Sequence, residues 1–142
     1  MTLRYLLDTN IVSSPVSKTP NPQIVKRLEQ DGDECAIAAP VWHELIHGCR
    51  RLPRGRRRTA LETYLHDVVQ ASFPILPYDE VAAMWHGRER ARLEELGRRT
   101  AYVDGQIASI AHAHGLVLVT IKTKDFTGFK DLEVENWSNR RG

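Results

Sequence analysis

The chain alternates between short apolar runs and longer stretches in which apolar residues recur at helical spacing. The runs 3–7, 35–38 and 116–119 have the length of strands and predict buried strands. The last of these is wholly apolar, which is typical of a central parallel strand. Residues 73–76 lie between two prolines, which confines them to a sheet edge or an extended linker. Residues 134–137 predict a last edge strand.

The stretches between these runs predict helices. Asn21 and Asp79 are favourable N-cap residues, and Gly97 and Gly115 stand where helices would end. In the longest stretch, apolar residues follow one another at three- and four-residue steps and predict a core-facing stripe. Its members are Val81, Met84, Trp85, Leu93 and Leu96. The predicted helices cover residues 21–28, 40–48, 61–68, 79–97 and about 104–114.

The order of these elements predicts the fold class. Strands that alternate with helices over short links predict an α/β protein, a three-layer α/β/α sandwich with a mostly parallel central sheet. The segment after Asp8 that contains Pro15 and Pro20 is expected to be a loop, and residues 1–142 to form a single domain. In such sheets ligands bind outside the carboxyl ends of the strands. Asp8 and Thr120 each directly follow a predicted strand and are expected there.

The composition is that of an ordinary globular protein. Hydrophobic residues make up 42% of the chain and the formal net charge is +2, which excludes disordered and fibrous classes. The two cysteines are too few for the disulfide framework of a small secreted domain, which favours a reducing cytosol. No signal-peptide pattern is present, and no stretch approaches the roughly 18 to 20 apolar residues of a membrane span. We expect a cytoplasmic protein with no membrane partner.

The small net charge conceals a strongly basic segment between Arg50 and Arg58, which contains six arginines and no acidic residue. Pro53 and Gly55 interrupt it, so we expect a loop or the start of a helix. Such a run is either a solvated surface, a contact for a phosphate backbone or a contact for a partner chain. The candidates for RNA or partner contact are Arg54, Arg56, Arg57 and Arg58. Arginines in the long helix alternate with glutamates and predict a salt-bridged surface.

Three acidic residues occupy unusual places: Asp8 directly after a buried strand, Glu44 in an apolar helix segment and Asp104 in the first turn of an apolar helix. Taken singly, each has an ordinary explanation as a turn, solvent-facing or cap residue. If the sheet is doubly wound, however, the three converge on one crevice, where their repulsion requires a cation. Carboxylates without thiolates select Mg²⁺ or Mn²⁺, and such an ion supports phosphodiester hydrolysis.

Five segments resemble the successive signatures of the PIN-domain family, in particular the VapC-type toxins of bacterial toxin-antitoxin pairs. They are residues 6–12 (LLDTNIV), 42–48 (WHELIHG), 102–108 (YVDGQIA), 115–120 (GLVLVT) and 132–137 (LEVENW), in the order of that family. The resemblance implies a Mg²⁺- or Mn²⁺-dependent endoribonuclease that is cytoplasmic and usually a homodimer. It also implies a cognate antitoxin as partner and an RNA substrate, with tRNA or another structured RNA as a candidate.

The resemblance assigns metal binding and catalysis to Asp8, Glu44 and Asp104, with Thr9, Asn10 and Thr120 in support. At a fourth position the family usually has Asn or Asp, whereas this chain has Lys122. A charged lysine does not ligate a metal. Either Asp125 supplies a fourth carboxylate, or the Lys122 ammonium stabilises developing phosphate charge, which we favour. A third possibility is weak activity.

Two competing hypotheses remain. His43, Glu44 and His47 form a literal H-E-x-x-H, the pattern in which two histidines one helical turn apart bind the zinc of a metalloprotease. This pattern leaves Asp8 and Asp104 unexplained and has no third ligand at the expected spacing. The second hypothesis is a binding or regulatory domain that keeps the PIN-like fold but has weakened catalysis because of Lys122.

Overall fold

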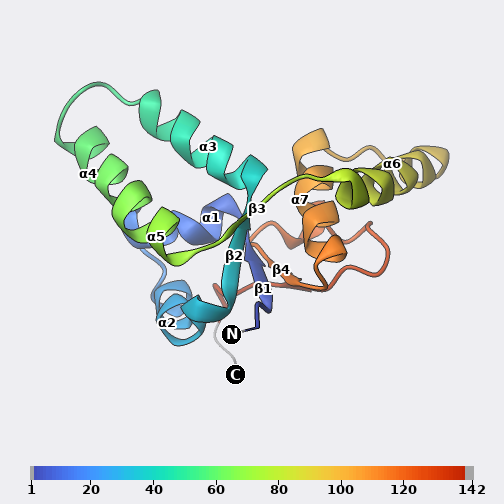
Figure 1. Ribbon diagram of the computed structural model, residues 1–142, viewed down its shortest axis with the longest axis horizontal. Helices are drawn as coiled ribbons and strands as arrows, with labels where there is room; N and C mark the ends of the chain where they lie inside the picture. Colours follow the sequence, from blue (N-terminus) through green and yellow to red (C-terminus); the bar gives the residue numbers. More distant parts are fainter. Residues whose placement is uncertain (1, 140–142) are drawn as a thin grey trace.

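The computed structural model describes residues 2–139 and contains a five-stranded, all-parallel sheet (Figure 1). Each predicted strand is present, usually shorter than its apolar run. The strands are β1 (Tyr5–Leu7), β2 (Cys35–Ala38), β3 (Ile75–Leu76), β4 (Val117–Val119) and β5 (Val134–Glu135). The order is β3-β2-β1-β4-β5, so the proline-flanked β3 and the last strand β5 are the edges, as predicted.

Seven α-helices connect the strands within the described residues. They are α1 (Thr9–Val12), α2 (Pro22–Asp31), α3 (Ala39–Arg50), α4 (Arg56–Tyr64), α5 (Gln70–Ser72), α6 (Glu80–Glu95) and α7 (Tyr102–Ala113). A π-helical turn at Leu65–Val69 joins α4 to α5. The predicted loop after Asp8 is wrong in its first part, because Asp8 accepts a hydrogen bond from the Thr9 amide and caps α1 directly.

The path of the chain creates a switch point in the sheet. It runs outward from β1 to β2 and β3, then returns to the opposite side of β1 to form β4 and β5. Helices α6 and α7 cover one side of the sheet, and α1, α2, α4 and α5 cover the other (Figure 1). The predicted α/β/α sandwich is therefore confirmed. Ligand sites in such sheets lie where the strand order reverses, here outside the carboxyl ends of β1 and β4.

The core lies on both sides of the short strands. Leu6, Leu7 and Leu118 are fully buried, and Leu7 is in register with Ile37 on one side and Val119 on the other. Cys35, expected to be a small core residue, is likewise buried. Because the central strands are apolar on both faces, the polar residues that follow them are held at the edge of a rigid sheet.

The face of α6 that meets the core differs from the prediction. Val81, Met84 and Leu96 are exposed, whereas the buried stripe passes through Ala82, His86, Glu89 and Leu93. The two polar members are buried because each has partners. Tyr78 makes a hydrogen bond of 2.8 Å to His86, and Arg92 makes two of 2.8 Å to Glu89. The predicted salt-bridged surface therefore contains the pair of Glu89 and Arg92, but the glutamate of that pair is buried.

Two of the three tryptophans are packing residues, as predicted. Trp137 is buried and packs edge-on against Tyr5, and Trp85 stacks on His112 with 4.4 Å between ring centroids. Within residues 2–139, none of the helices combines the length and the apolar character needed to cross a membrane.

Candidate functional site

Asp8 lies at the switch point and is held by hydrogen bonds to both of its oxygens. The carboxylate is only 7% exposed. Its Oδ1 accepts from the Thr9 amide at 2.8 Å, and its Oδ2 accepts from the Thr120 hydroxyl at 2.8 Å and from the Asn10 side-chain amide at 3.2 Å. A buried carboxylate with this many donors is fixed in orientation.

Thr120 and Asn10 connect the ends of β1 and β4. The Thr120 hydroxyl accepts from the Lys122 amide at 3.0 Å while it donates to Asp8, and Asn10 Oδ1 accepts from the Ile121 amide at 3.1 Å. Thr120 itself is fully buried. Both side chains are therefore at the crevice where the sequence places them. Asn10, after β1, binds the backbone that follows β4, and Thr120, after β4, binds the side chain of Asp8 at the end of β1.

Glu44 reaches the same crevice from α3. Helix α3 begins directly after β2 and passes beside α1 (Figure 1). The Oε2 of Glu44 accepts a hydrogen bond of 3.2 Å from the Thr9 hydroxyl. The residue is exposed, as its ordinary explanation predicts, but its carboxylate is tethered toward Asp8 by way of Thr9.

Asp104 completes the group from the opposite side of the sheet. It is the third residue of α7, since the helix begins two residues earlier than predicted. The pKa of this carboxyl is raised to about 6, mainly by burial and then by the charges of Asp8, Asp125 and Glu44, while Lys122 lowers it. The structure therefore brings the three predicted acids to one place, where the other carboxylates disfavour the ionised form of Asp104.

These acids form a carboxylate donor set of the kind that Mg²⁺ and Mn²⁺ prefer. As the side chains stand in residues 2–139, no three His, Cys, Asp or Glu residues form a complete ligand set. Glu44 is exposed and can turn, whereas Asp8 is fixed. The raised pKa of Asp104 shows that a cation at this place would relieve repulsion.

A close contact between α6 and α7 sets the position of Asp104. A Cβ atom added to Gly105 would overlap the imidazole of His86, so only glycine permits this approach. His86 is buried, and its pKa is lowered by that burial and by the nearby Arg90 charge. The neutral ring packs beside the residue that follows Asp104. This contact is not among the predictions from the sequence, although a histidine among apolar residues of the long helix was a signal for it.

The charges of Lys122 and Asp125 both act on Asp104. Lys122 lowers the pKa of this carboxyl and Asp125 raises it. Lys122 is the N-cap of a 3₁₀ turn at Thr123–Asp125, and Asp125 is the last residue of that turn. The turn follows directly from the end of β4.

His43 and His47 lie one turn apart on the exposed side of α3, with 6.2 Å between their ring centroids. The glutamate between them is bound to Thr9, and no third protein ligand joins the two histidines in the described part of the chain. The zinc-site interpretation of H-E-x-x-H therefore has no support in this geometry.

Arg50 ends α3, and the rest of the arginine run lies in the loop between α3 and α4 and in the first turn of α4, as predicted (Figure 1). Arg50 and Arg58 both pair with Glu62, at 2.9 and 3.2 Å. The guanidinium of Arg58 is thus already engaged. Arg54, Arg56 and Arg57 are exposed at the end of α3 away from β2.

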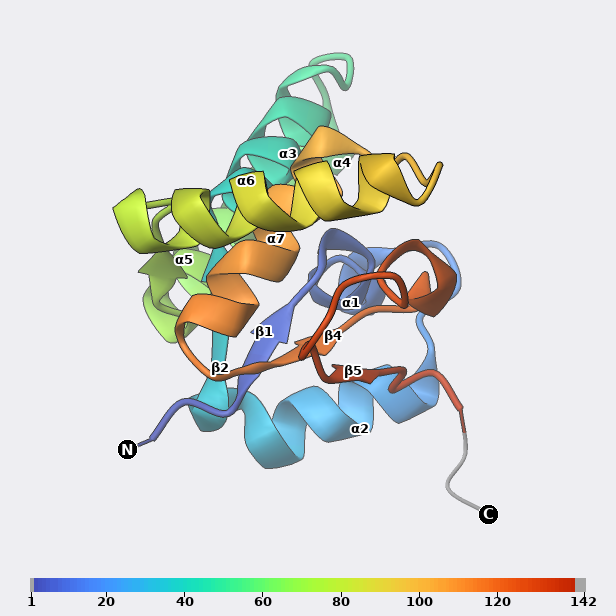
Figure 2. The same ribbon diagram turned by 90° about the vertical axis from the view of Figure 1, so that its right-hand side faces the viewer.

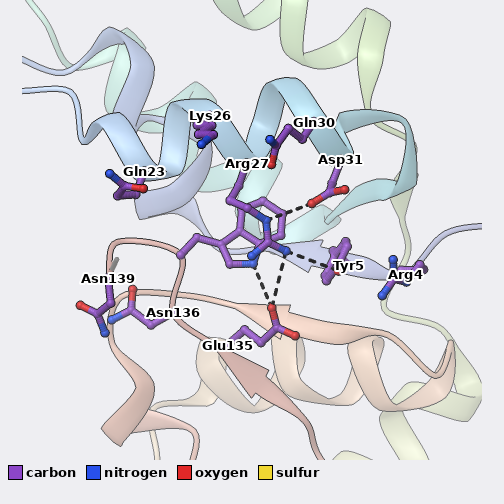
Figure 3. Close-up of a pocket in the computed structure, with 11 residues that line it drawn as sticks. Arg4, Tyr5, Gln23, Lys26, Arg27, Gln30, Asp31, Glu135, Asn136 and Asn139 are labelled. Atoms are coloured by element: carbon purple, nitrogen blue, oxygen red, sulfur yellow. Dashed lines mark hydrogen bonds and ion pairs between the residues drawn. The ribbon is translucent and has the colours of Figure 1, made fainter. Parts of the chain in front are cut away.

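A second polar feature lies at the opposite end of the sheet, where Arg27 lines a cavity of about 820 Å³ (Figure 3). The guanidinium stacks over Trp137 at 4.3 Å and pairs with Asp31 at 2.9 Å and Glu135 at 3.8 Å. Because these partners neutralise Arg27 and the cavity adjoins Tyr5 at the start of β1, it is separate from the carboxylate group.

Comparisons with known proteins agree with this geometry. A family model described as PIN domain matches residues 5–131. The tRNA(fMet)-specific endonuclease VapC of Shigella flexneri is 30% identical over 137 residues, 96% of this chain and 99% of that protein. Toxin FitB of Neisseria gonorrhoeae is 32% identical over 124 residues, 85% of this chain and 89% of that protein. A solved structure of FitAB bound to a DNA fragment is similar with a TM-score of 0.89 at 28% identity, covering 97% of this chain and 98% of the other.

Proposed function

Because this chain belongs to the PIN-domain family, we propose that it is a metal-dependent endoribonuclease, the toxin of a toxin-antitoxin pair. The observation that carries this proposal is the convergence of Asp8, Glu44 and Asp104 at the switch point of the sheet. The likeness to proteins named as endonuclease and toxin extends over nearly the whole of this chain.

In this proposal Asp8, Glu44 and Asp104 would hold Mg²⁺ or Mn²⁺. The ion, when bound, would supply charge stabilisation for the phosphate and a water of lowered pKa. The chain's own contribution is orientation. Thr120 and Asn10 keep Asp8 in a single position, Thr9 directs Glu44 toward it, and the buried contact at Gly105 fixes the start of α7.

For the fourth position we propose that the Lys122 ammonium neutralises charge developing on the phosphate. Its effect on the pKa of Asp104 supports a place near the crevice. Asp125 as a fourth carboxylate is the second candidate, because its charge acts on Asp104 in the opposite sense.

The proposed partners follow from the resemblance to VapC-type toxins. They are a small cognate antitoxin, a second copy of this chain in a homodimer and an RNA substrate in the cytoplasm. The name of the Shigella relative makes initiator tRNA the first substrate to test.

The test is cleavage of initiator tRNA and of total RNA by the purified chain with and without Mg²⁺. We expect Mg²⁺-dependent cleavage that Asp8→Ala or Asp104→Ala abolishes, while the matched control Asp67→Ala, an exposed residue of the π-helical turn, leaves it unchanged. Correctly folded protein that cleaves no RNA in Mg²⁺ or Mn²⁺ would overturn the proposal in favour of a binding domain. Stoichiometric, tightly bound zinc would overturn it in favour of the His43 and His47 site.

A further inference from the structure

Tyr102 differs from every other aromatic side chain in the described part of the chain because it is exposed. It is the first residue of α7, 52% exposed and two residues before Asp104. The other tryptophan, tyrosine and phenylalanine residues of 2–139 are buried or half-buried. Its position puts an exposed aromatic ring in the first turn of the helix that carries a candidate catalytic carboxylate.

The ring of Tyr102 is held in place by α6, which crosses α7 (Figure 2). It lies against the buried His86, with 5.1 Å between ring centroids, and the guanidinium of Arg90 lies 5.5 Å from its centroid. His86 is in turn bound to Tyr78 and packed against Gly105. The aromatic surface is therefore oriented in advance, and a flat ligand would order few further side chains on contact.

A basic groove continues from this ring. Arg90, Arg98, Arg99 and Thr100, with Glu94, line a cavity of about 310 Å³ between the end of α6 and the start of α7. Within residues 2–139, none of these three arginines lies within ion-pair distance of a carboxylate. Their charge is thus available to an anion, in contrast to Arg50 and Arg58, which share Glu62.

An exposed aromatic ring next to unpaired arginines is the combination that binds single-stranded nucleic acid. Bases stack on the ring and on guanidinium planes, and phosphates bind the arginines. We propose that Tyr102 stacks a base of single-stranded RNA beside the carboxylate group and that Arg90, Arg98 and Arg99 bind the phosphates that follow. This proposal rests on the ribonuclease function above and adds the side of the site along which the RNA lies.

The groove fits RNA better than a protein partner. Its lining is polar and mostly cationic, and it extends from α6 to Thr100, just before the start of α7. The apolar residues Val81 and Met84, which would suit a protein contact, lie near the other end of α6.

The test measures binding of the full-length chain to a fluorescein-labelled single-stranded RNA of twelve mixed-sequence nucleotides. Ca²⁺ replaces Mg²⁺, so that the carboxylates remain neutralised, and a gel verifies that the RNA is intact. We expect Tyr102→Ala to weaken binding at least about fivefold, the lower limit for loss of one stacked base, and Tyr102→Phe to remain within about twofold of the native chain. Arg90→Gln/Arg98→Gln/Arg99→Gln should lower the slope of log K against log salt by about 2, since each lost contact accounts for about 0.7.

The control removes exposed cations elsewhere, Lys18→Gln/Lys26→Gln, and should change the salt slope less. Unchanged affinity of Tyr102→Ala, or an equal loss in Tyr102→Phe, would overturn the stacking role. A change in sedimentation of Tyr102→Ala at unchanged RNA affinity would show a contact between chains instead. A native chain that cleaves RNA while Tyr102→Ala has native KM and affinity overturns this subsite alone, whereas a native chain that neither binds nor cleaves RNA overturns the proposed function as well.

Discussion

Replacing Asp104 with Asn should make the metal-free protein more stable at neutral pH. The folded state raises the pKa of this carboxyl from 3.8 to about 6, mainly through burial and then through the charge of Asp8. A shift of about two units corresponds to about 3 kcal/mol between the protonation states. Because the raised pKa belongs to the folded state, the stabilisation is complete below pH 3.8 and is lost as pH rises through about 6.

Asparagine has nearly the same shape as the protonated acid but carries no charge at any pH. The free energy of unfolding of Asp104→Asn should therefore exceed that of the native chain by about 1 to 3 kcal/mol at pH 7.5, allowing for solvent screening. At pH 4 the two should agree closely. Urea unfolding in EDTA at both pH values measures the difference, with exposed Asp67→Asn as control. Added Mg²⁺ should stabilise the native chain more than the variant.

Two results would refute this reasoning. One is a difference in the free energy of unfolding between Asp104→Asn and the native chain that is the same at pH 4 and pH 7.5. Such a difference would come from packing and not from charge. The other is a variant that is less stable than the native chain at pH 7.5 in EDTA, which would mean that the carboxylates do not repel each other.

Three further predictions concern the supporting residues. Thr120→Val removes the hydroxyl that donates to Asp8, and should lower the free energy of unfolding by about 1.5 to 3 kcal/mol in urea titration and weaken Mg²⁺ binding in calorimetry, with Thr120→Ser restoring both. Gly105→Ala forces His86 aside and should lower the free energy of unfolding by about 1 to 3 kcal/mol, measured by thermal unfolding. If the losses of the two single variants simply add in a His86→Ala/Gly105→Ala double variant, a direct clash is contradicted. Lys122→Asn should slow RNA cleavage in a rate assay, and a faster rate would exclude a catalytic role for the lysine.

The sequence predicts most of the fold because its signals are local. Apolar runs of strand length and caps such as Asn21 locate every strand and the main helices, and the alternation of elements predicts the parallel sheet. The face of α6 could not be predicted in this way. His86 and Glu89 are buried because of partners at Tyr78 and at the Lys130 amide, and hydrophobic spacing carries no information about such partners.

The functional site, too, could be predicted from the sequence only in part. Asp8, Glu44 and Asp104 could be expected near one another from the ends of the elements that carry them. The hydrogen bonds from Thr120 and the steric role of Gly105 depend on how the strands and helices pack, which no single segment determines. Tyr102 lay inside a recognised signature, but its exposure is a property of the folded surface alone.

The hydrogen bond between Asp8 and Thr120 joins residues 112 positions apart. Strand β1 can pair with β4 only after β2, β3 and the intervening helices have been synthesised. Long-range parallel pairing of this kind has a high contact order and forms late in folding. On a ribosome, Asp8 would emerge early but could not acquire its partner until residues beyond Thr120 had left the exit tunnel. If the chain is a ribonuclease toxin, this topology delays its activity until synthesis is well advanced, which gives an antitoxin already present time to bind.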